Sequence, residues 1–356
     1  MALPTVRRFA VLLAGAILVL SLAVAAEQAS SGQTRTPALG RAVDGASGIQ
    51  ARLSRLASVV PAYRGGPTVA STGETVDVRV SDALPAEIAT PEHWAEFLTH
   101  LEHGPELAQL TVYIVTFDEM QSVCSDRALG CYVANTLVAP GETAFDTTPE
   151  EIVRHEYGHH IALHRLNPPW AAVDWGPKRW ASAVNVCARV ARTELYPGNE
   201  STQYRLNPGE AWAETYRILQ ERKAGITTNS WQIVDSSLFP NDAALQAAEQ
   251  DVIHPWTGPT TRTFTRVFGK KTARMWWIPL STPLDGDYRL SATVPARGSA
   301  DVALVGSNRS TVLRRAQWVG QRSKQAQGTI CGQRSLFVRV TEKGLLGRVR
   351  VSVTTP

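Results

Sequence analysis

The stretch "TPEEIVRHEYGHHIALHR" (residues 148–165) contains four of the chain's eight histidines, and two of them bracket a glutamate. Thr148, Pro149 and Glu151 have the form of a capping box with proline at the first helical position. Such a combination is a strong sign of a helix N-terminus. The sequence therefore predicts a helix that begins here and runs to about Leu166.

Within this predicted helix, His155, Glu156 and His159 form the pattern HExxH. Residues four apart in a helix lie about 40° apart on its surface, so both imidazoles can reach one metal ion. Zinc suits imidazole ligands and keeps a coordination position for water at catalytic sites, where a glutamate such as Glu156 can accept the proton of the attacking water. The alternative is a surface helix that is rich in histidine. His160 and His164 lie on the other side of the helix, and we expect them to be surface or packing residues.

A catalytic zinc ion needs a third protein ligand. The metzincin pattern would place a histidine six residues after His159, but Arg165 stands there. The segment "GEAWAETY" instead supplies Glu210 as the expected ligand, and Glu214, one turn later, is expected to accept a hydrogen bond from a ligand histidine. An ordinary solvated acidic face is the alternative interpretation of this pair. Two further carboxylates, in poorer sequence context, are Asp174 and Glu194.

HExxH followed by a helix with the pattern E-x-x-A-E resembles the gluzincin zinc metallopeptidases. In that family the first glutamate of the second helix is the third zinc ligand, which implies Glu210. The string "NPGEAWAET" is similar to the lethal-factor-type branch, and Asn207 and Glu214 match its pattern around the ligand. In that branch a tyrosine stabilises the oxyanion. Tyr204 lies one residue from that position, so the resemblance implies a catalytic role for it, with a packing role as the alternative.

The predicted elements before the ligand helix also resemble a zincin core. Alternating and β-branched stretches predict strands, and apolar residues at helical spacing predict helices. The expected class is α+β, with a small mixed sheet and active-site helices. In such enzymes the strand just upstream of the motif helix pairs with an extended substrate, and "CYVANTLVAP" occupies that place. The predicted strands are 74–80, 110–117 and 131–140, and the predicted helices are 51–60, 91–102, 148–166, 178–194 and 207–223.

The hydrophobic pattern of the sequence changes after residue 258. Short alternating stretches separated by Gly, Pro, Asp and Ser predict an all-β sandwich, similar to the pre-peptidase C-terminal domains of secreted bacterial peptidases. We therefore expect a zincin-like catalytic domain followed by a basic sandwich. The expected division is a signal peptide (1–26), a flexible lead-in or pro-segment (27–73), the catalytic domain (74–256) and the β-sandwich domain (259–356).

The N-terminus has the pattern of a secretory signal. Two arginines precede an apolar run that ends in small residues near Ala25 and Ala26. An uncleaved membrane anchor is the alternative. An exported, extracellular or envelope-associated protein would form disulfides, and four cysteines allow three pairings. The short spacing of Cys124 and Cys131 favours one pair between them, which leaves Cys187 and Cys331 as the second pair.

Charge is divided unevenly along the chain. From Pro259 onward there are 17 Lys and Arg against 4 Asp and Glu, so a basic segment follows an acidic one. Two interpretations remain open: the two parts attract each other, or the basic part binds an anionic envelope polymer. No specific nucleic-acid partner is inferred.

The sequence as a whole predicts a secreted zinc metalloendopeptidase that acts on a peptide or protein substrate. The first alternative is an envelope-binding or adhesion protein that zinc stabilises without catalysis and that acts through its basic β domain. The second is a non-peptidase hydrolase that acts on an amide of the envelope.

Overall fold

The computed structural model describes residues 46–60, 62–227, 233–270, 272–295, 298–343 and 347–356. The chain divides into two units, residues 1–35 and 36–356, and every described residue belongs to the second. The expected signal peptide (1–26) lies outside the described residues, as does the lead-in up to residue 45. In the ranges that the structure describes, no helix has the length and the apolar character needed to cross a bilayer.

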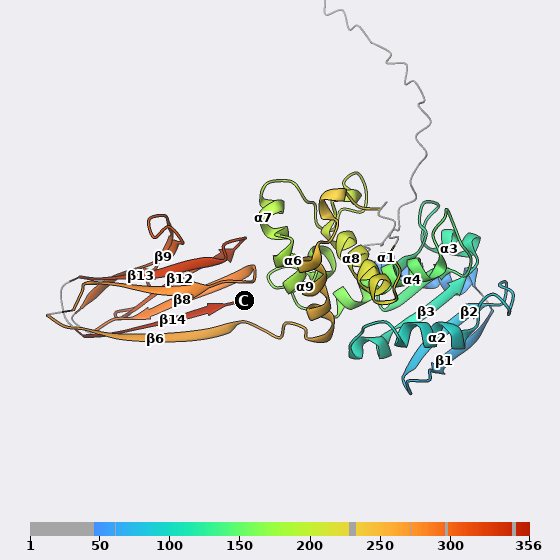
Figure 1. Cartoon of the computed structure of the whole chain (residues 1–356), viewed down its shortest axis with the longest axis horizontal. Coiled ribbons are helices and arrows are strands. Elements are labelled where there is room, and N and C mark those ends of the chain that lie inside the picture. Colours follow the sequence, from blue (N-terminus) through green and yellow to red (C-terminus); the bar gives the residue numbers. More distant parts are fainter. Residues whose placement is uncertain (1–45, 61, 228–232, 271, 296–297, 344–346) are drawn as a thin grey trace, which may run out of the picture. The chain divides into compact units, whose positions relative to one another are not determined.

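The described chain has a mixed α+β architecture (Figure 1). The first sheet has the strand order β1-β2-β3-β5-β4. Its centre is parallel, because β2 pairs with β3 and β3 with β5 in that sense, whereas β1 and β4 are antiparallel to their neighbours. The strand β4 therefore forms one edge of this sheet. The bounds are β1 (Tyr63–Val69), β2 (Thr75–Ser81), β3 (Thr111–Val115), β4 (Cys131–Val133) and β5 (Thr136–Pro140).

Helices follow and cover this sheet. One hydrophobic core joins the inner faces of β2, β3 and β5 to α2, α4 and α8, with Tyr157 and Trp212 fully buried in it. The helix α4 contacts both β5 and α8. The α-helices are α1 (Ala46–Val59), α2 (Pro91–Thr99), α3 (Phe117–Val123), α4 (Pro149–Leu163), α5 (Ala172–Trp175), α6 (Lys178–Ala183), α7 (Val186–Ala191), α8 (Pro208–Lys223) and α9 (Asp242–Ile253); the 3-10 helices are η1 (Pro105–Gln109), η2 (Tyr204–Leu206) and η3 (Ser236–Leu238).

Three predicted elements differ from the structure. The predicted strand 131–140 is a hairpin of β4 and β5, because Ala134 and Asn135 adopt positive φ values of 45° and 66° and turn the chain back. The predicted helix 178–194 is broken into α6 and α7 at Asn185, whose φ is 56°. The described part of the expected flexible lead-in is not featureless, since it contains α1 and β1.

The C-terminal strands form two sheets that share one hydrophobic core. Their strand orders are β10-β9-β13-β7 and β11-β12-β8-β14-β6, and every pairing in them is antiparallel. Alternating side chains face the core, as in β13, where every second residue is buried. This arrangement is that of a β-sandwich. The bounds are β6 (Thr260–Phe268), β7 (Met275–Ser281), β8 (Gly286–Thr293), β9 (Ser299–Gly306), β10 (Val312–Arg315), β11 (Gln317–Trp318), β12 (Ser323–Ile330), β13 (Ser335–Lys343) and β14 (Gly347–Thr355).

Two disulfides are present, Cys124–Cys131 and Cys187–Cys331. The first connects the end of α3 to the start of β4. The second connects α7 to the segment between β12 and β13. Near it, the ammonium group of Lys178 donates hydrogen bonds to the carbonyl oxygens of Pro168 and Asp285, at 2.7 and 3.0 Å. Covalent and polar contacts therefore join the helical part of the chain to the sandwich.

Candidate metal centre

Two helices carry the residues of this centre, and both begin as the sequence predicts. In α4, the Thr148 side chain accepts from the backbone N–H of Glu151, and Glu151 accepts in return from the Thr148 N–H. In α8, the Asn207 side chain accepts from the N–H of Gly209 at 3.0 Å. These caps satisfy donors that would otherwise lack partners at each helix start, and they fix where each helix begins.

A close approach of the two helices brings their polar residues together. A Cβ atom added at Gly158 would lie only 2.8 Å from the Cα of Ala213, so the absence of a side chain permits this contact. The Trp212 indole N–H also donates to the Gly158 carbonyl at 2.7 Å. Gly158 therefore positions α8 against α4 at the level of the HExxH histidines.

His155, His159 and Glu210 meet at this contact. Their side chains are fully buried, and one ligand atom from each lies within 4.8 Å of the others; in the described part of the chain, this is the one such group of three. The Glu210 carboxylate lies 3.3 Å from Nε2 of His155 and 3.4 Å from Nε2 of His159. Both contacts are long for hydrogen bonds, whose usual N···O distance is about 2.9 Å.

The separations fit a shared tetrahedral ion. Ligand atoms about 2.0–2.1 Å from such an ion lie about 3.3–3.4 Å from one another. Two imidazoles and a carboxylate are also the donor types that zinc accepts. The three side chains are therefore close enough to hold one metal ion, and their chemistry suits a divalent cation of the zinc type.

The electrostatics of the centre favour positive charge. Burial lowers the pKa of His155, but hydrogen bonds to Glu210 and Glu214 outweigh burial and raise it to about 10. Burial raises the pKa of Glu210, but the charge of His159 and hydrogen bonds to both histidines hold it well below its ordinary value. The pocket thus stabilises cationic histidine and anionic carboxylate, and a divalent cation satisfies the same field.

Glu214 lies behind His155, on the side of the ring away from Glu210. Its carboxylate lies 3.0 Å from Nδ1 of His155 and accepts two hydrogen bonds from Arg217, at 2.6 and 2.9 Å. Burial raises the pKa of Glu214, but the charge of Arg217 and the His155 hydrogen bond lower it to about 2. Arg217 is a residue of this centre that was not predicted from the sequence. Arg217 follows Glu214 by three residues and precedes Glu221 by four. In a helix this spacing places the arginine next to both carboxylates, and it is the feature of the sequence that could have indicated the ion pairs.

Glu156 is fully buried beside the pair of histidines. A Cβ atom added at Gly130 would lie 3.0 Å from Oε1 of Glu156 and 2.6 Å from Ile152. Gly130 immediately precedes the edge strand β4, so the start of that strand passes directly beside the Glu156 carboxylate. No local pattern marks this glycine, because its neighbour Glu156 is 26 residues away in the chain.

Tyr204 and Asn207 come from the segment before α8. The Tyr204 hydroxyl donates to Glu210 at 2.7 Å, and burial together with the charge of Glu210 raises the pKa of Tyr204 well above its ordinary value. The Asn207 side chain accepts from the Gly198 N–H at 3.1 Å and donates to Glu200 at 2.9 Å, so it supports the segment before α8 rather than a ligand histidine directly. Oxyanion stabilisation by Tyr204 stays a prediction.

The remaining candidates lie elsewhere. His160 is buried and packs between the Tyr132 hydroxyl and the Glu106 carbonyl oxygen, at 2.9 and 2.8 Å. His164 contacts the Asn135 side chain at 2.9 Å. Glu194 is an exposed residue that pairs with Arg192. Neither of the alternative carboxylates, Asp174 or Glu194, belongs to the group of three.

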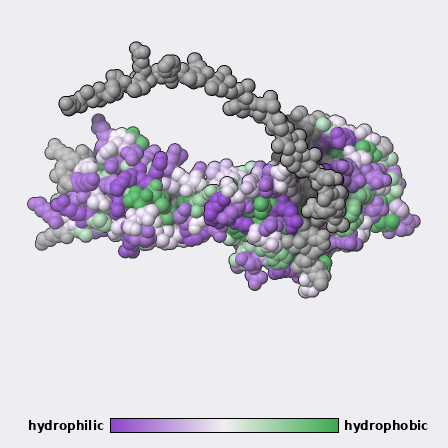
Figure 2. Space-filling view, turned by 90° about the horizontal axis from the view of Figure 1, so that it is seen from above, coloured by the Kyte–Doolittle hydropathy of each residue, from purple (hydrophilic) through white to green (hydrophobic). Residues whose placement is uncertain are grey.

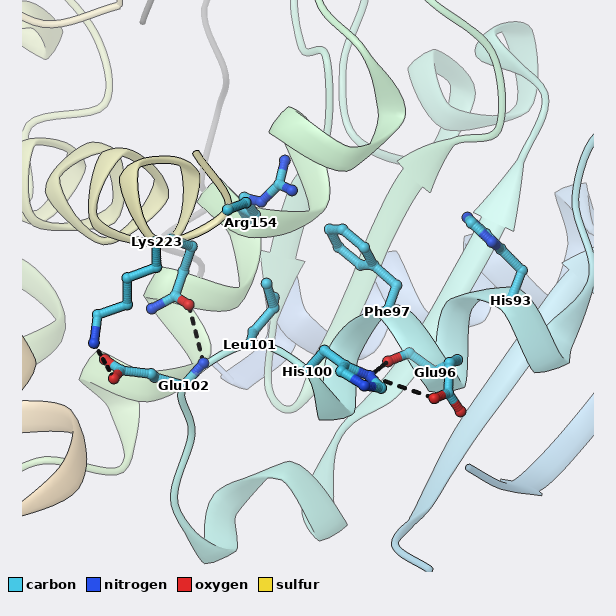
Figure 3. Close-up of a pocket in the computed structure, with 10 residues that line it drawn as sticks. His93, Glu96, Phe97, His100, Leu101, Glu102, Arg154 and Lys223 are labelled. Carbon is cyan, nitrogen blue, oxygen red and sulfur yellow. Dashed lines mark hydrogen bonds and ion pairs between the residues drawn. The ribbon is translucent and has the colours of Figure 1, made fainter. Parts of the chain in front are cut away.

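A cavity of about 470 Å³ lies between α2 and the C-terminal end of α8 (Figure 3). Arg154, the residue before His155, contributes to its lining, but His155, His159 and Glu210 do not. Two ion pairs lie among the residues that line this cavity: Lys223 pairs with Glu102, and His100 pairs with Glu96. Its charges are thus largely paired internally, and the cavity is separate from the group His155, His159 and Glu210.

Comparison with known proteins gives little further information. No family model matches this sequence, and a search of curated proteins gives no match. Among solved structures, the chain is similar to the pre-peptidase C-terminal domain of a collagenase from Bacillus anthracis, with 11% identity and a TM-score of 0.23. The similarity covers 26% of this chain and 88% of that chain. A TM-score this low carries no argument about the fold or the centre.

Proposed function

We propose that this protein is an exported zinc-dependent endopeptidase, with His155, His159 and Glu210 as the metal ligands. The observation that carries the proposal is the meeting of these three buried side chains at separations that suit one tetrahedral ion. Glu156 adds to the argument, because a metal site that only stabilised the fold would have no use for a buried carboxylate beside its ligands.

Each residue of the centre would have its own role in peptide-bond hydrolysis. A zinc ion, when bound, supplies Lewis-acid chemistry that lowers the pKa of water and polarises a carbonyl oxygen. Glu156 would accept a proton from the attacking water and return it to the departing amine nitrogen, so that one peptide bond breaks and one water is consumed. Glu214 would hold the ring of His155 in place, and the Tyr204 hydroxyl would hold Glu210.

We propose the edge strand β4, whose three residues are buried, as the place where an extended peptide pairs. The strand β4 pairs with β5 on one side and ends the sheet on the other. An extended chain can add to such an edge through main-chain hydrogen bonds. Because Gly130 leads into β4 beside Glu156, a peptide paired along β4 would carry its scissile bond past that carboxylate.

The decisive experiment combines metal analysis with a peptide library. We expect one zinc per purified chain, cleavage of peptides that a chelator abolishes, and a loss of about 10²–10⁴-fold in kcat/KM for Glu156→Gln with zinc retained. Glu150→Gln, a matched change in the first turn of the same helix, should cleave normally. Equal cleavage by Glu156→Gln and wild type would overturn the proposal. Zinc binding with cleavage of envelope amides but not peptides would reassign the substrate.

A further inference from the structure

An aromatic and cationic cluster lies on the outer face of the sheet β10-β9-β13-β7. Along β13, the residues Leu336, Val338 and Val340 are buried in the sandwich core, whereas Phe337 and Arg339 alternate with them on the opposite face. In the register of the sheet, Arg339 stands directly opposite Trp277 of β7. With Arg309, which follows β9, we call Trp277, Phe337, Arg309 and Arg339 the aromatic–arginine face.

Both guanidinium groups of this face lie against rings. The Cζ atom of Arg309 lies 4.5 Å from the ring centre of Phe337 and 5.8 Å from that of Trp277. The Cζ atom of Arg339 lies 5.9 Å from the Trp277 ring, and the two rings meet edge to face at 6.0 Å. These distances are within the range of cation–π contacts.

Neither arginine has an acidic partner within the described ranges of the chain. The nearby Asp301 pairs with Arg315 instead. In Arg339 the Nε atom is buried and makes no hydrogen bond to any described residue. A guanidinium group has five donors in a planar fork that fits a carboxylate, so these two groups retain the capacity to bind carboxylates from another molecule.

A tight turn holds Arg309 in its position. The backbone N–H of Arg309 donates to Gly306 at 2.9 Å, and the Asn308 side chain accepts from the N–H groups of Ser310 and Thr311, both at 3.0 Å. Arg309 has a φ of 58°, which is uncommon for a residue with a side chain. The turn therefore fixes this arginine over the rings at a conformational cost, and such a cost is typical of functional positions.

We propose that the aromatic–arginine face binds a carboxylated polysaccharide, with sugar rings on Trp277 and Phe337 and uronate carboxylates on Arg309 and Arg339. Charge complementarity supports an anionic partner, because the chain from Pro259 onward has 17 Lys and Arg against 4 Asp and Glu. The side of the sandwich seen in Figure 2 is largely hydrophilic, with scattered hydrophobic residues.

The compartment favours a polysaccharide over nucleic acid. The two disulfides indicate an oxidising compartment, where extracellular and envelope polysaccharides occur. This inference does not depend on peptidase activity, and a chain without catalysis would bind in the same way.

The test measures binding of the full chain to immobilised polygalacturonate by biolayer interferometry. The double variant Arg309→Gln/Arg339→Gln should bind at least about tenfold more weakly than wild type. The matched control is Arg348→Gln/Arg350→Gln, which removes the same charge from exposed positions of β14 in the other sheet. We expect the control to stay within about threefold of wild type, because it changes net charge but no ring-stacked guanidinium.

Further variants and further polymers test which chemical groups of the bound polymer the face recognises. Trp277→Leu should weaken binding to polygalacturonate and leave binding to polyglutamate unchanged, because only the sugar rings need the indole. If the glutamine variant fails to fold, Arg309→Lys/Arg339→Lys retains charge and should still weaken binding, since lysine lacks the planar fork. Equal losses in the two double glutamine variants would overturn the inference, as would tighter binding of single-stranded DNA through the same residues. Peptide cleavage in solution should be unchanged in all variants, which separates this test from that of the proposed function.

Discussion

Glu214 links the proposed metal ligand His155 to a buried arginine. Its carboxylate lies between Nδ1 of His155 and the guanidinium of Arg217, which also pairs with Glu221. An anionic acceptor behind an imidazole fixes the ring orientation and makes the other nitrogen a better metal ligand. Arg217 holds the charge of Glu214 in place, so under the proposed function the pair would act on a bound metal through His155.

Glu214→Gln tests this link. Because glutamine keeps the shape but removes the charge, we expect the affinity for zinc to fall by about 10–100-fold. Zinc affinity can be measured by competition with a chromogenic chelator. The control is Glu221→Gln, which makes the same change on the other side of Arg217 without touching His155, and it should change the affinity by less than about threefold. Equal losses in the two variants would contradict the link.

At the scale of single residues, the sequence predicted that the two histidines of HExxH would lie side by side. It did not predict which other residues surround them in the folded chain. HExxH on a capped helix places His155 and His159 side by side, because helix geometry alone determines that relation. The positions of Gly130 and Arg217 depend on how separate segments pack. Nothing in the residues near Gly130 indicates that Glu156 will be its neighbour, since that contact forms only in the folded sheet.

The contact between α4 and α8 depends on Gly158. Replacing a glycine inside a helix by alanine usually stabilises the helix by about 0.5–1 kcal/mol. Here the added methyl would meet the backbone of Ala213 at 2.8 Å, and overpacking of this kind typically costs about 1–3 kcal/mol. We expect Gly158→Ala to lower the free energy of unfolding and to weaken zinc binding, because α8 carries Glu210. Chemical denaturation and zinc titration measure both. A variant that is more stable and binds zinc normally would show that the contact does not position the ligand.

Element boundaries could be predicted where side chains define them. The capping box at Thr148 and the cap at Asn207 were recognisable because capping needs specific residue types at fixed spacing. The hairpin between β4 and β5 was missed because its turn, Ala134-Asn135, lacks the glycine that usually marks such turns. The break at Asn185 was missed because asparagine also occurs inside helices.

Lys178 gives the described chain a pH-dependent contribution to stability. Burial lowers its pKa to about 8, although the charge of Asp285 opposes the shift. In the unfolded chain the pKa is about 10.4, so between these two values the unfolded state binds the proton and the folded state does not. The contribution of Lys178 to stability therefore rises from about pH 8 to about pH 10.4, and below pH 8 the penalty for burying the charge is fully present.

Lys178→Met isolates this contribution. The free energy of unfolding of wild type, relative to the variant, should increase between pH 7.5 and pH 10. Urea denaturation at a series of pH values measures it. A constant difference across that range would mean that Lys178 titrates alike in the folded and unfolded states.

At the scale of the whole molecule, the two disulfides should differ in their effect on stability. Cys187 and Cys331 are 144 residues apart, whereas Cys124 and Cys131 are 7 apart. In the chain-entropy model, closing the longer loop contributes about 5 kcal/mol and closing the shorter one about 2 kcal/mol. Paired Cys→Ser variants of each bridge, unfolded in denaturant, test this. A larger loss for the shorter loop would contradict the entropic account.

The sequence predicted the succession of a mixed α+β part and an all-β part, because residue periodicity and turn residues are local properties. It could not give the strand orders. The pairing of β14 with both β6 and β8 joins residues 57 to 95 positions apart, and no local pattern specifies such partners. The division into domains and the export of the chain stay predictions.

The most direct test of the metal site is anomalous diffraction from crystals of the zinc-loaded protein, recorded on both sides of the zinc absorption edge. The account predicts a single anomalous peak per chain, within about 2.0–2.2 Å of the His155 and His159 imidazoles and the Glu210 carboxylate. A peak bound by other residues, or no peak between α4 and α8, would contradict it.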